Sequence, residues 1–125
     1  MTGYNHGTPF MLGRLLSANM NSTSDQAIYV VSSNYVLYGI LVTNASTSLT
    51  TAAGGVYTAA SKGGTAIVAS TQVYTALTGS TKALWLTIAA AGQDKLTAAP
   101  IYLSLTTGQG SAATADAYVF GYALD

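Results

Sequence analysis

Apolar and polar residues alternate in short stretches along most of the chain, and pieces rich in glycine, serine, threonine and asparagine separate these stretches. In Ala83–Ala89, for example, Leu84, Leu86 and Ile88 fall on one face. A period of two is typical of β-strands that have one face on a core. The pattern predicts strands over Leu12–Leu16, Gln26–Val31, Tyr35–Thr43, Val56–Ala60, Thr65–Ala69, Val73–Leu77, Ala83–Ala89, Ile101–Thr106 and Ala117–Ala123.

These strands follow one another closely, and only Ala89–Gln93 is expected to form a helical turn between them. Many short strands without an amphipathic helix are typical of an all-β sandwich or barrel. We therefore predict a single β-sandwich, jelly-roll-like and of eight or nine strands, over residues 12–125. Residues 1–11 contain two glycines and a proline, which discourage regular structure, and are predicted to form an extended amino-terminal arm.

The predicted strand Tyr35–Thr43 is apolar on both of its faces. A strand of this kind needs cover on both sides of its sheet. One face is expected to lie on the core, and the other either on a neighbouring subunit or under a long loop. Strict alternation puts Tyr35, Leu37 and Leu41 on one face and Val36, Tyr38, Ile40 and Val42 on the other.

A second excess of apolar surface lies in Ala117–Ala123, where alternation puts three aromatic side chains on one face. Together the two strands have more apolar surface than one core of this size needs. We therefore predict a homo-oligomer, with a trimer as the first choice and a dimer as the second. The side chains assigned to interfaces are Tyr4, His6, Phe10, Tyr35, Leu37, Tyr118, Phe120 and Tyr122.

Charged residues make up only 6% of the 125 residues, and the net charge at pH 7 is zero, whereas about 25% is usual. Without a basic cluster to neutralise phosphates, nucleic acid is not an expected partner. The lack of cysteine excludes a disulfide scaffold and thiolate chemistry. No apolar run approaches the roughly 20 residues of a membrane span, and the first residues lack the features of a secretory signal. We therefore expect synthesis in a host cytoplasm and no membrane partner.

Catalytic and metal-binding side chains are few and scattered. The one histidine, His6, lies in the glycine-containing arm, far in the sequence from a serine and a carboxylate that would complete a triad. Gly108–Gly110 lacks the third glycine of a dinucleotide fingerprint and precedes a strand instead of a helix. We therefore expect no enzyme activity, no metal and no cofactor. The aspartates are assigned to turns or to the chain end, and they are Asp25, Asp94, Asp116 and Asp125.

The composition instead fits a structural assembly protein. A surface with few charges has little electrostatic protection against association. Serine, threonine and alanine also lose less side-chain entropy on packing than lysine or glutamate. A carbohydrate-binding β-sandwich module is the alternative, because nine tyrosines and Trp85 are candidates for stacking on sugar rings. The same aromatic side chains are also enriched where proteins meet one another.

Three parts of the chain carry a resemblance to a known group of proteins. Gly13–Ile28, Val42–Val68 and Tyr118–Tyr122 resemble small structural proteins encoded among the head genes of tailed bacteriophages and prophages. The similarity covers most of the chain after residue 12. Capsid decoration (cement) proteins are the closest of these in size and β-rich character.

The resemblance implies a virion protein on the outer capsid surface. Its partner is then the major capsid protein, whose adjacent subunits it clamps without covalent bonds. A tail, collar or head-fibre component is the alternative within the same resemblance. The arm contains aromatic residues that are costly to leave in water. We therefore expect the arm to become ordered on a capsid or sister subunit, with Tyr4 and Phe10 as anchors.

Overall fold

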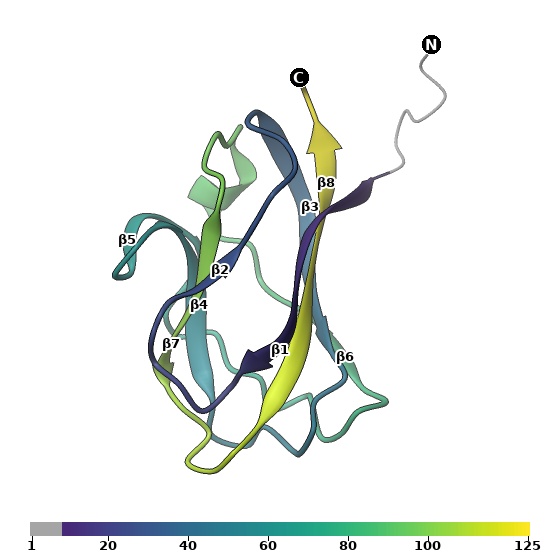
Figure 1. The fold of residues 1–125 in the computed structure, drawn as a ribbon, viewed down its shortest axis with the longest axis vertical. Coiled ribbons are helices and arrows are strands. Elements are labelled where there is room, and N and C mark those ends of the chain that lie inside the picture. The colour runs from purple at the N-terminus through teal and green to yellow at the C-terminus, as the bar shows by residue number, and fades with distance from the viewer. Residues whose placement is uncertain (1–8) are drawn as a thin grey trace.

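The computed structural model describes residues 9–125, which form two antiparallel four-stranded sheets packed face to face (Figure 1). Sheet A has the strand order β1-β8-β3-β6, and sheet B has the order β2-β7-β4-β5. The prediction of an all-β sandwich is confirmed. The strands are β1 (Phe10–Asn19), β2 (Gln26–Ile28), β3 (Tyr35–Thr43), β4 (Ala53–Ala59), β5 (Gly63–Val68), β6 (Ala83–Trp85), β7 (Ile101–Thr107) and β8 (Thr114–Ala123).

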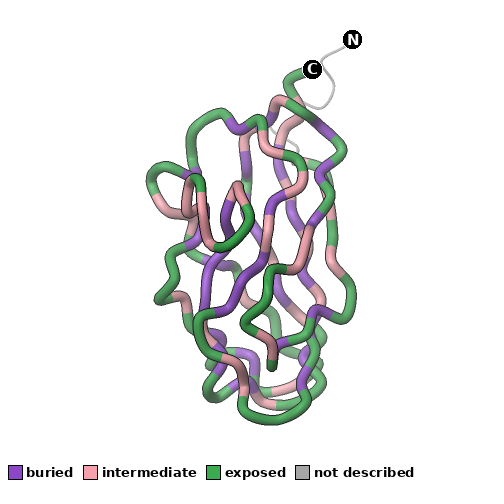
Figure 2. The backbone as a smooth tube through the Cα atoms, turned by 60° about the vertical axis from the view of Figure 1, so that its left-hand side comes forward, coloured by how far each residue is buried: buried purple, intermediate pink, exposed green. Residues whose placement is uncertain are grey.

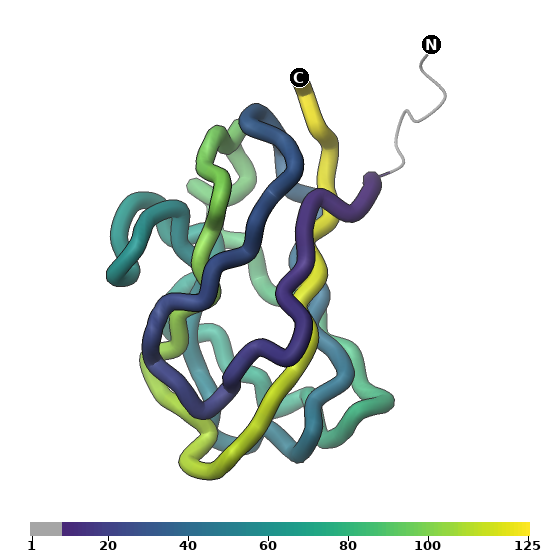
Figure 3. Tube along the Cα trace, viewed as in Figure 1, coloured from purple at the N-terminus to yellow at the C-terminus, as the bar shows by residue number. Residues whose placement is uncertain are grey.

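The strands pair in a nested order. β1 pairs with β8, β2 with β7, β3 with β6 and β4 with β5. Additional pairing of β3 with β8 and of β4 with β7 completes the two sheets. The chain therefore resembles one long antiparallel hairpin, with its tip between β4 and β5, rolled so that successive strand pairs alternate between sheets. Figure 3 shows this course from the purple β1 to the teal tip and back to the yellow β8.

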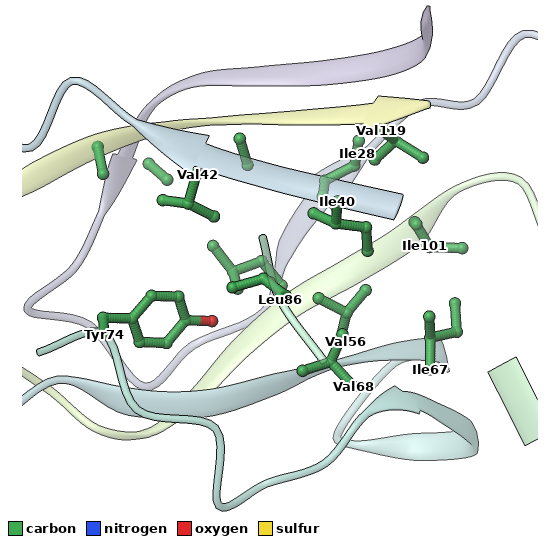
Figure 4. Close-up of a cluster of buried hydrophobic side chains, with 14 of the residues drawn as sticks. Ile28, Ile40, Val42, Val56, Ile67, Val68, Tyr74, Leu86, Ile101 and Val119 are labelled. Carbon is green, nitrogen blue, oxygen red and sulfur yellow. The ribbon is translucent and has the colours of Figure 1, made fainter. Parts of the chain in front are cut away.

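A single apolar core fills the space between the sheets. Figure 4 shows Ile40 and Val42 of sheet A facing Val56 and Val68 of sheet B. All four side chains are at most 2% exposed. Buried and less buried residues alternate along β8, and Figure 2 shows the burial of the whole described chain. The alternation that the sequence predicted for Ile101–Thr106 is present, with Ile101, Leu103 and Leu105 in the core.

One predicted strand, Val73–Leu77, is not formed. Val73 makes only an isolated bridge to Ala53. Tyr74 and Leu77 are both fully buried, although side chains three residues apart point to opposite faces of a strand. A turn closed by the Leu77 N–H on the Tyr74 carbonyl (2.9 Å) brings both side chains into the core. The alternation pattern did not predict this turn, because Val73–Leu77 has the composition of a strand.

The boundaries near the amino end also differ from the prediction. β1 begins at Phe10, so Phe10 and Met11 belong to the sandwich and not to the arm. Tyr4 and His6 lie outside the described residues. The short helical turn is present as a 3-10 helix over Ala90–Gln93. Within residues 9–125, no helix is long and apolar enough to cross a membrane.

Candidate interaction surface

A β-bulge in β3 decides which of its side chains reach the surface. Leu37 is opposite Gly121 of β8 and Gly39 is opposite Phe120, so Tyr38 is an extra residue between them. An extra residue reverses the alternation of faces beyond it. Tyr35 and Leu37 before the bulge therefore face the core, as do Ile40 and Val42 after it.

The assignment of Tyr35 and Leu37 to an interface is therefore wrong. Tyr35 is fully buried, and its hydroxyl donates a hydrogen bond to the Ala98 carbonyl (2.5 Å). Burial raises the pKa of Tyr35 to about 12, which keeps the phenol protonated as a donor. Leu37 is 9% exposed and belongs to the same core.

The opposite side of sheet A carries apolar side chains that the described chain leaves partly uncovered. Tyr118, Phe120 and Tyr122 alternate with the core residues Ala117 and Val119 along β8. Cross-strand neighbours from β3 and β6 lie on the same side. We call this surface the outer aromatic face, and its residues are Val36, Tyr38, Leu41, Trp85, Tyr118, Phe120 and Tyr122.

Trp85 is the centre of an aromatic cluster on this face. Its ring lies 5.9 Å from the ring of Tyr38, at an interplanar angle of 86°, and 5.8 Å from that of Phe120, at 55°. Gly39 makes this arrangement possible, because a Cβ there would lie 2.9 Å from the Trp85 ring. Tyr38 is nevertheless 59% exposed and Trp85 51%. The cluster is therefore preorganised but is not buried by the described chain.

Two charged side chains border the outer aromatic face. Arg14 of β1 is opposite Tyr118. Asp116 precedes Tyr118 on the same side of β8. Its carboxylate accepts hydrogen bonds from the Ser17 N–H (2.7 Å) and the Asn44 side-chain amide (2.9 Å). The partners of Asp116 are therefore neutral. Its hydrogen bond with the Ser17 N–H holds the β1 bulge between Leu15 and Ala18 in place.

The outer side of sheet B is closed by the chain itself. Ser104 of β7 points away from the core but is fully buried. Its hydroxyl donates to the Asp25 carboxylate (2.8 Å) and accepts from the Lys62 ammonium (2.9 Å). Lys62 also donates to the Thr23 carbonyl (3.1 Å), and the Ser61 N–H donates to Asp25 (2.7 Å). We call Asp25, Ser61, Lys62 and Ser104 the polar clamp.

The clamp combines a serine and a lysine, a pair that also occurs in nucleophilic catalysis. Here the Ser104 hydroxyl is already a donor to Asp25, and its full burial keeps a substrate carbonyl from reaching it. The hydrogen bonds from the Ser61 backbone and the Ser104 hydroxyl lower the pKa of Asp25. The geometry is that of a structural tie between the β4–β5 turn, β7 and the segment before β2.

Other sites for small ligands are poorly developed in the described part of the chain. Residues 9–125 contain no group of three or more histidine, cysteine, aspartate or glutamate side chains that could hold a metal. An open pocket of about 310 Å³ is lined by Ala69, Thr71, Gln72, Val73, Thr87 and Ala89, which include no aromatic ring for a sugar to stack on.

The structure shows where the remaining predicted interface residues of the described chain lie, and their role in an interface stays a prediction. Tyr118, Phe120 and Tyr122 do share one face, and Phe10 is 44% exposed at the start of β1. Tyr38 and Trp85 were not among the predicted interface residues. A signal for them existed, because an isolated glycine inside a strand, here Gly39, indicates a bulge or a close approach of another group.

Comparison with known proteins identifies no relative: no family model, no curated protein and no solved structure matches this chain. The residues of the two outer faces are therefore the basis for a functional proposal. One face is closed by the polar clamp, and the other presents the outer aromatic face.

Proposed function

We propose that this chain is a structural protein of a tailed-bacteriophage virion, a small decoration (cement) protein on the outer surface of the head. In this role it binds major capsid subunits non-covalently, stabilises the contacts between them and catalyses no reaction. The resemblance of three parts of the chain to phage head-gene products supports the proposal. So does a composition with few charges, which suits a subunit that is packed among neighbours.

The outer aromatic face is the observation that carries the proposal. Large apolar patches on a protein surface mark sites of interaction. Tyrosine and tryptophan are the residue types that contribute most to the binding energy of such sites. The cluster around Trp85 combines half-exposed rings with a fixed arrangement, so little side-chain entropy is lost when a partner covers it.

The strand pairing adds support at the level of the fold. We infer from the nested pairing, β1 with β8 through β4 with β5, that the sandwich has jelly-roll topology. Jelly rolls of eight strands recur in viral capsid domains and in lectins. Because one fold serves several functions, this support is an analogy, and the residues of the face decide between the two classes.

The ring orientations favour a protein partner over a glycan. A sugar chain stacks best on ring faces that are open and nearly coplanar. The rings of Tyr38 and Trp85 are instead nearly perpendicular, and Trp85 also contacts Phe120. The exposed residues Tyr38 and Trp85 therefore form an uneven apolar surface of packed rings, which suits contact with another protein.

The test is the location of the chain in the particle. Virions of the phage that encodes this chain would be imaged by cryo-electron microscopy, and density matching the sandwich would be sought on the head. Density on the outer capsid surface, between major capsid subunits, is the expected result. Density confined to the tail or collar would contradict the decoration role, and absence of the chain from purified virions would refute the virion assignment. Micromolar binding to immobilised glycans would instead support the carbohydrate-binding alternative.

A further inference from the structure

One row of side chains crosses the full width of the outer face of sheet A. The strand registers place Arg14 opposite Tyr118, Tyr118 opposite Leu41, and Leu41 opposite Trp85. The row therefore begins with a cation on one edge strand and ends with an indole on the other. Three strand spacings of about 4.8 Å separate the two ends by about 14 Å.

This row is complementary to itself. A twofold axis that lies in the face and runs parallel to the strands exchanges the two edges of the sheet. Arg14 of one copy then faces Trp85 of the other, and the reverse contact forms at the opposite edge. In the middle of the row, Tyr118 of each copy faces Leu41 of its partner.

We propose that the outer aromatic face binds the same face of a second copy of this chain, with Arg14 of each copy on the Trp85 ring of the other. An isologous contact repeats every favourable pair twice. Arginine over the face of tryptophan is the best of the cation–π combinations. A net charge of zero leaves no overall repulsion between two copies. The dimer is the form that we expect of the free chain; a capsid subunit that binds the outer aromatic face competes with the second copy for it. The proposal selects the second of the two oligomeric states expected from the sequence.

The charge distribution favours a second copy over a charged partner. Arg14 is the only charged side chain in the row of Arg14, Tyr118, Leu41 and Trp85. Asp116, on the same side, is occupied by the Ser17 N–H and the Asn44 amide. A strongly acidic or basic partner would place most of its charged groups against the side chains of tyrosine, leucine and phenylalanine. A second copy instead brings one arginine for the tryptophan and one tryptophan for the arginine.

The size of the face predicts a reversible dimer. β1 and β8 each have ten residues and β3 has nine, so at about 3.3 Å per residue the strands are about 30 Å long. Three such strands give a flat area of roughly 430 Å² on each copy, or about 860 Å² in total, which is in the range of weak, transient interfaces. We therefore expect monomer–dimer exchange at micromolar to millimolar concentrations.

The first experiment measures self-association of the full chain by sedimentation velocity over that concentration range. Tyr38→Asp puts a negative charge on the outer aromatic face and should weaken dimerisation by at least about tenfold, because a carboxylate would be buried against the negative faces of aromatic rings. Val73→Asp is the matched control, since Val73 is 52% exposed and pairs with Ala53 of sheet B, away from the outer aromatic face. It should dimerise like the unmodified chain. Circular dichroism and thermal melting establish that both variants are folded.

The second experiment tests the orientation of the two copies. The chain has no cysteine, so single cysteines can be introduced at the two edges beside the row, by Leu16→Cys in the β1 bulge and Ala83→Cys on β6. Facing sheets lie about 10 Å apart, a span that a bismaleimide of similar length bridges. A mixture of the two variants should cross-link, because position 16 of one copy faces position 83 of the other. Each variant alone should cross-link far less.

Several results would overturn the proposal. A chain that stays monomeric at millimolar concentration has no self-binding face. Equal weakening by Tyr38→Asp and Val73→Asp would place the contact elsewhere, and efficient cross-linking of Leu16→Cys with itself would exclude this twofold axis. Location on the phage head is measured separately, so a monomeric decoration protein would refute the dimer alone, and a dimer that is absent from virions would refute only the proposed function.

Discussion

Asp25 and Asp125 are carboxylates whose serine partners stabilise the ionised form. Asp25 accepts from the Ser61 backbone and the Ser104 hydroxyl, while Asp125 accepts from the Ser32 hydroxyl (2.6 Å) and from Ser33. These hydrogen bonds lower the pKa of both carboxyl groups in the folded chain. A lowered folded-state pKa contributes stability that is complete above the unfolded value of 3.8 and is lost as the pH falls through the folded value.

We predict that Asp25→Asn lowers the melting temperature at neutral pH. In this variant the melting temperature should also decrease less when the pH is lowered from about 5 to about 2. The amide retains an acceptor but has no charge to be lost on acidification. Thermal melting followed by circular dichroism across this pH range measures both effects. Asp94→Asn is the control, because Asp94 is exposed and accepts no hydrogen bond from the described residues. An acid transition that is the same in both variants would contradict a stabilising role for the polar clamp.

Within the strands, Gly55 sets how closely two neighbouring segments approach. A Cβ on Gly55 of β4 would lie 2.0 Å from the Val68 carbonyl oxygen of β5, which is backbone and cannot move aside. We predict that Gly55→Ala lowers the free energy of unfolding by about 2–3 kcal/mol, as overpacked core sites do. Gly79→Ala is the matched control, because nothing lies within 4 Å of its Cβ.

The Gly79 variant should change the free energy of unfolding by less than about 0.5 kcal/mol. Chemical denaturation monitored by Trp85 fluorescence measures both variants. Equal stability of the two would mean that β4 and the end of β5 separate without cost, which would contradict the close approach on which sheet B depends.

For the whole molecule, the first eight residues contribute to none of the described strands. β1 begins at Phe10, which pairs with Gly121, so a deletion of residues 2–8 leaves every described strand intact. We predict an unchanged melting temperature for this truncated chain and a lower occupancy on phage capsids, because the aromatic anchor Tyr4 is lost. Quantitative gel analysis of capsids saturated with each form measures the occupancy. Equal occupancy would remove the clamping role of the arm.

The sequence by itself determined the fold class and most of the strands. Strict alternation in Ile101–Thr106 identified its core row, because a period of two is a local property of the chain and needs no partner to be recognised. Alternation in Ala117–Ala123 also put Tyr118, Phe120 and Tyr122 on one face. The low charge and the absence of cysteine limited the possible chemistry for the same reason, since composition does not depend on the fold.

Only the tertiary structure decided which apolar residues remain at the surface. One extra residue at Tyr38 reverses the faces of β3, so Tyr35 and Leu37 lie in the core. The pairing of β3 with β6 then brings Trp85 over Gly39 and beside Phe120. Bulges and strand neighbours depend on contacts between segments far apart in the chain, and alternation within one segment carries no information about them.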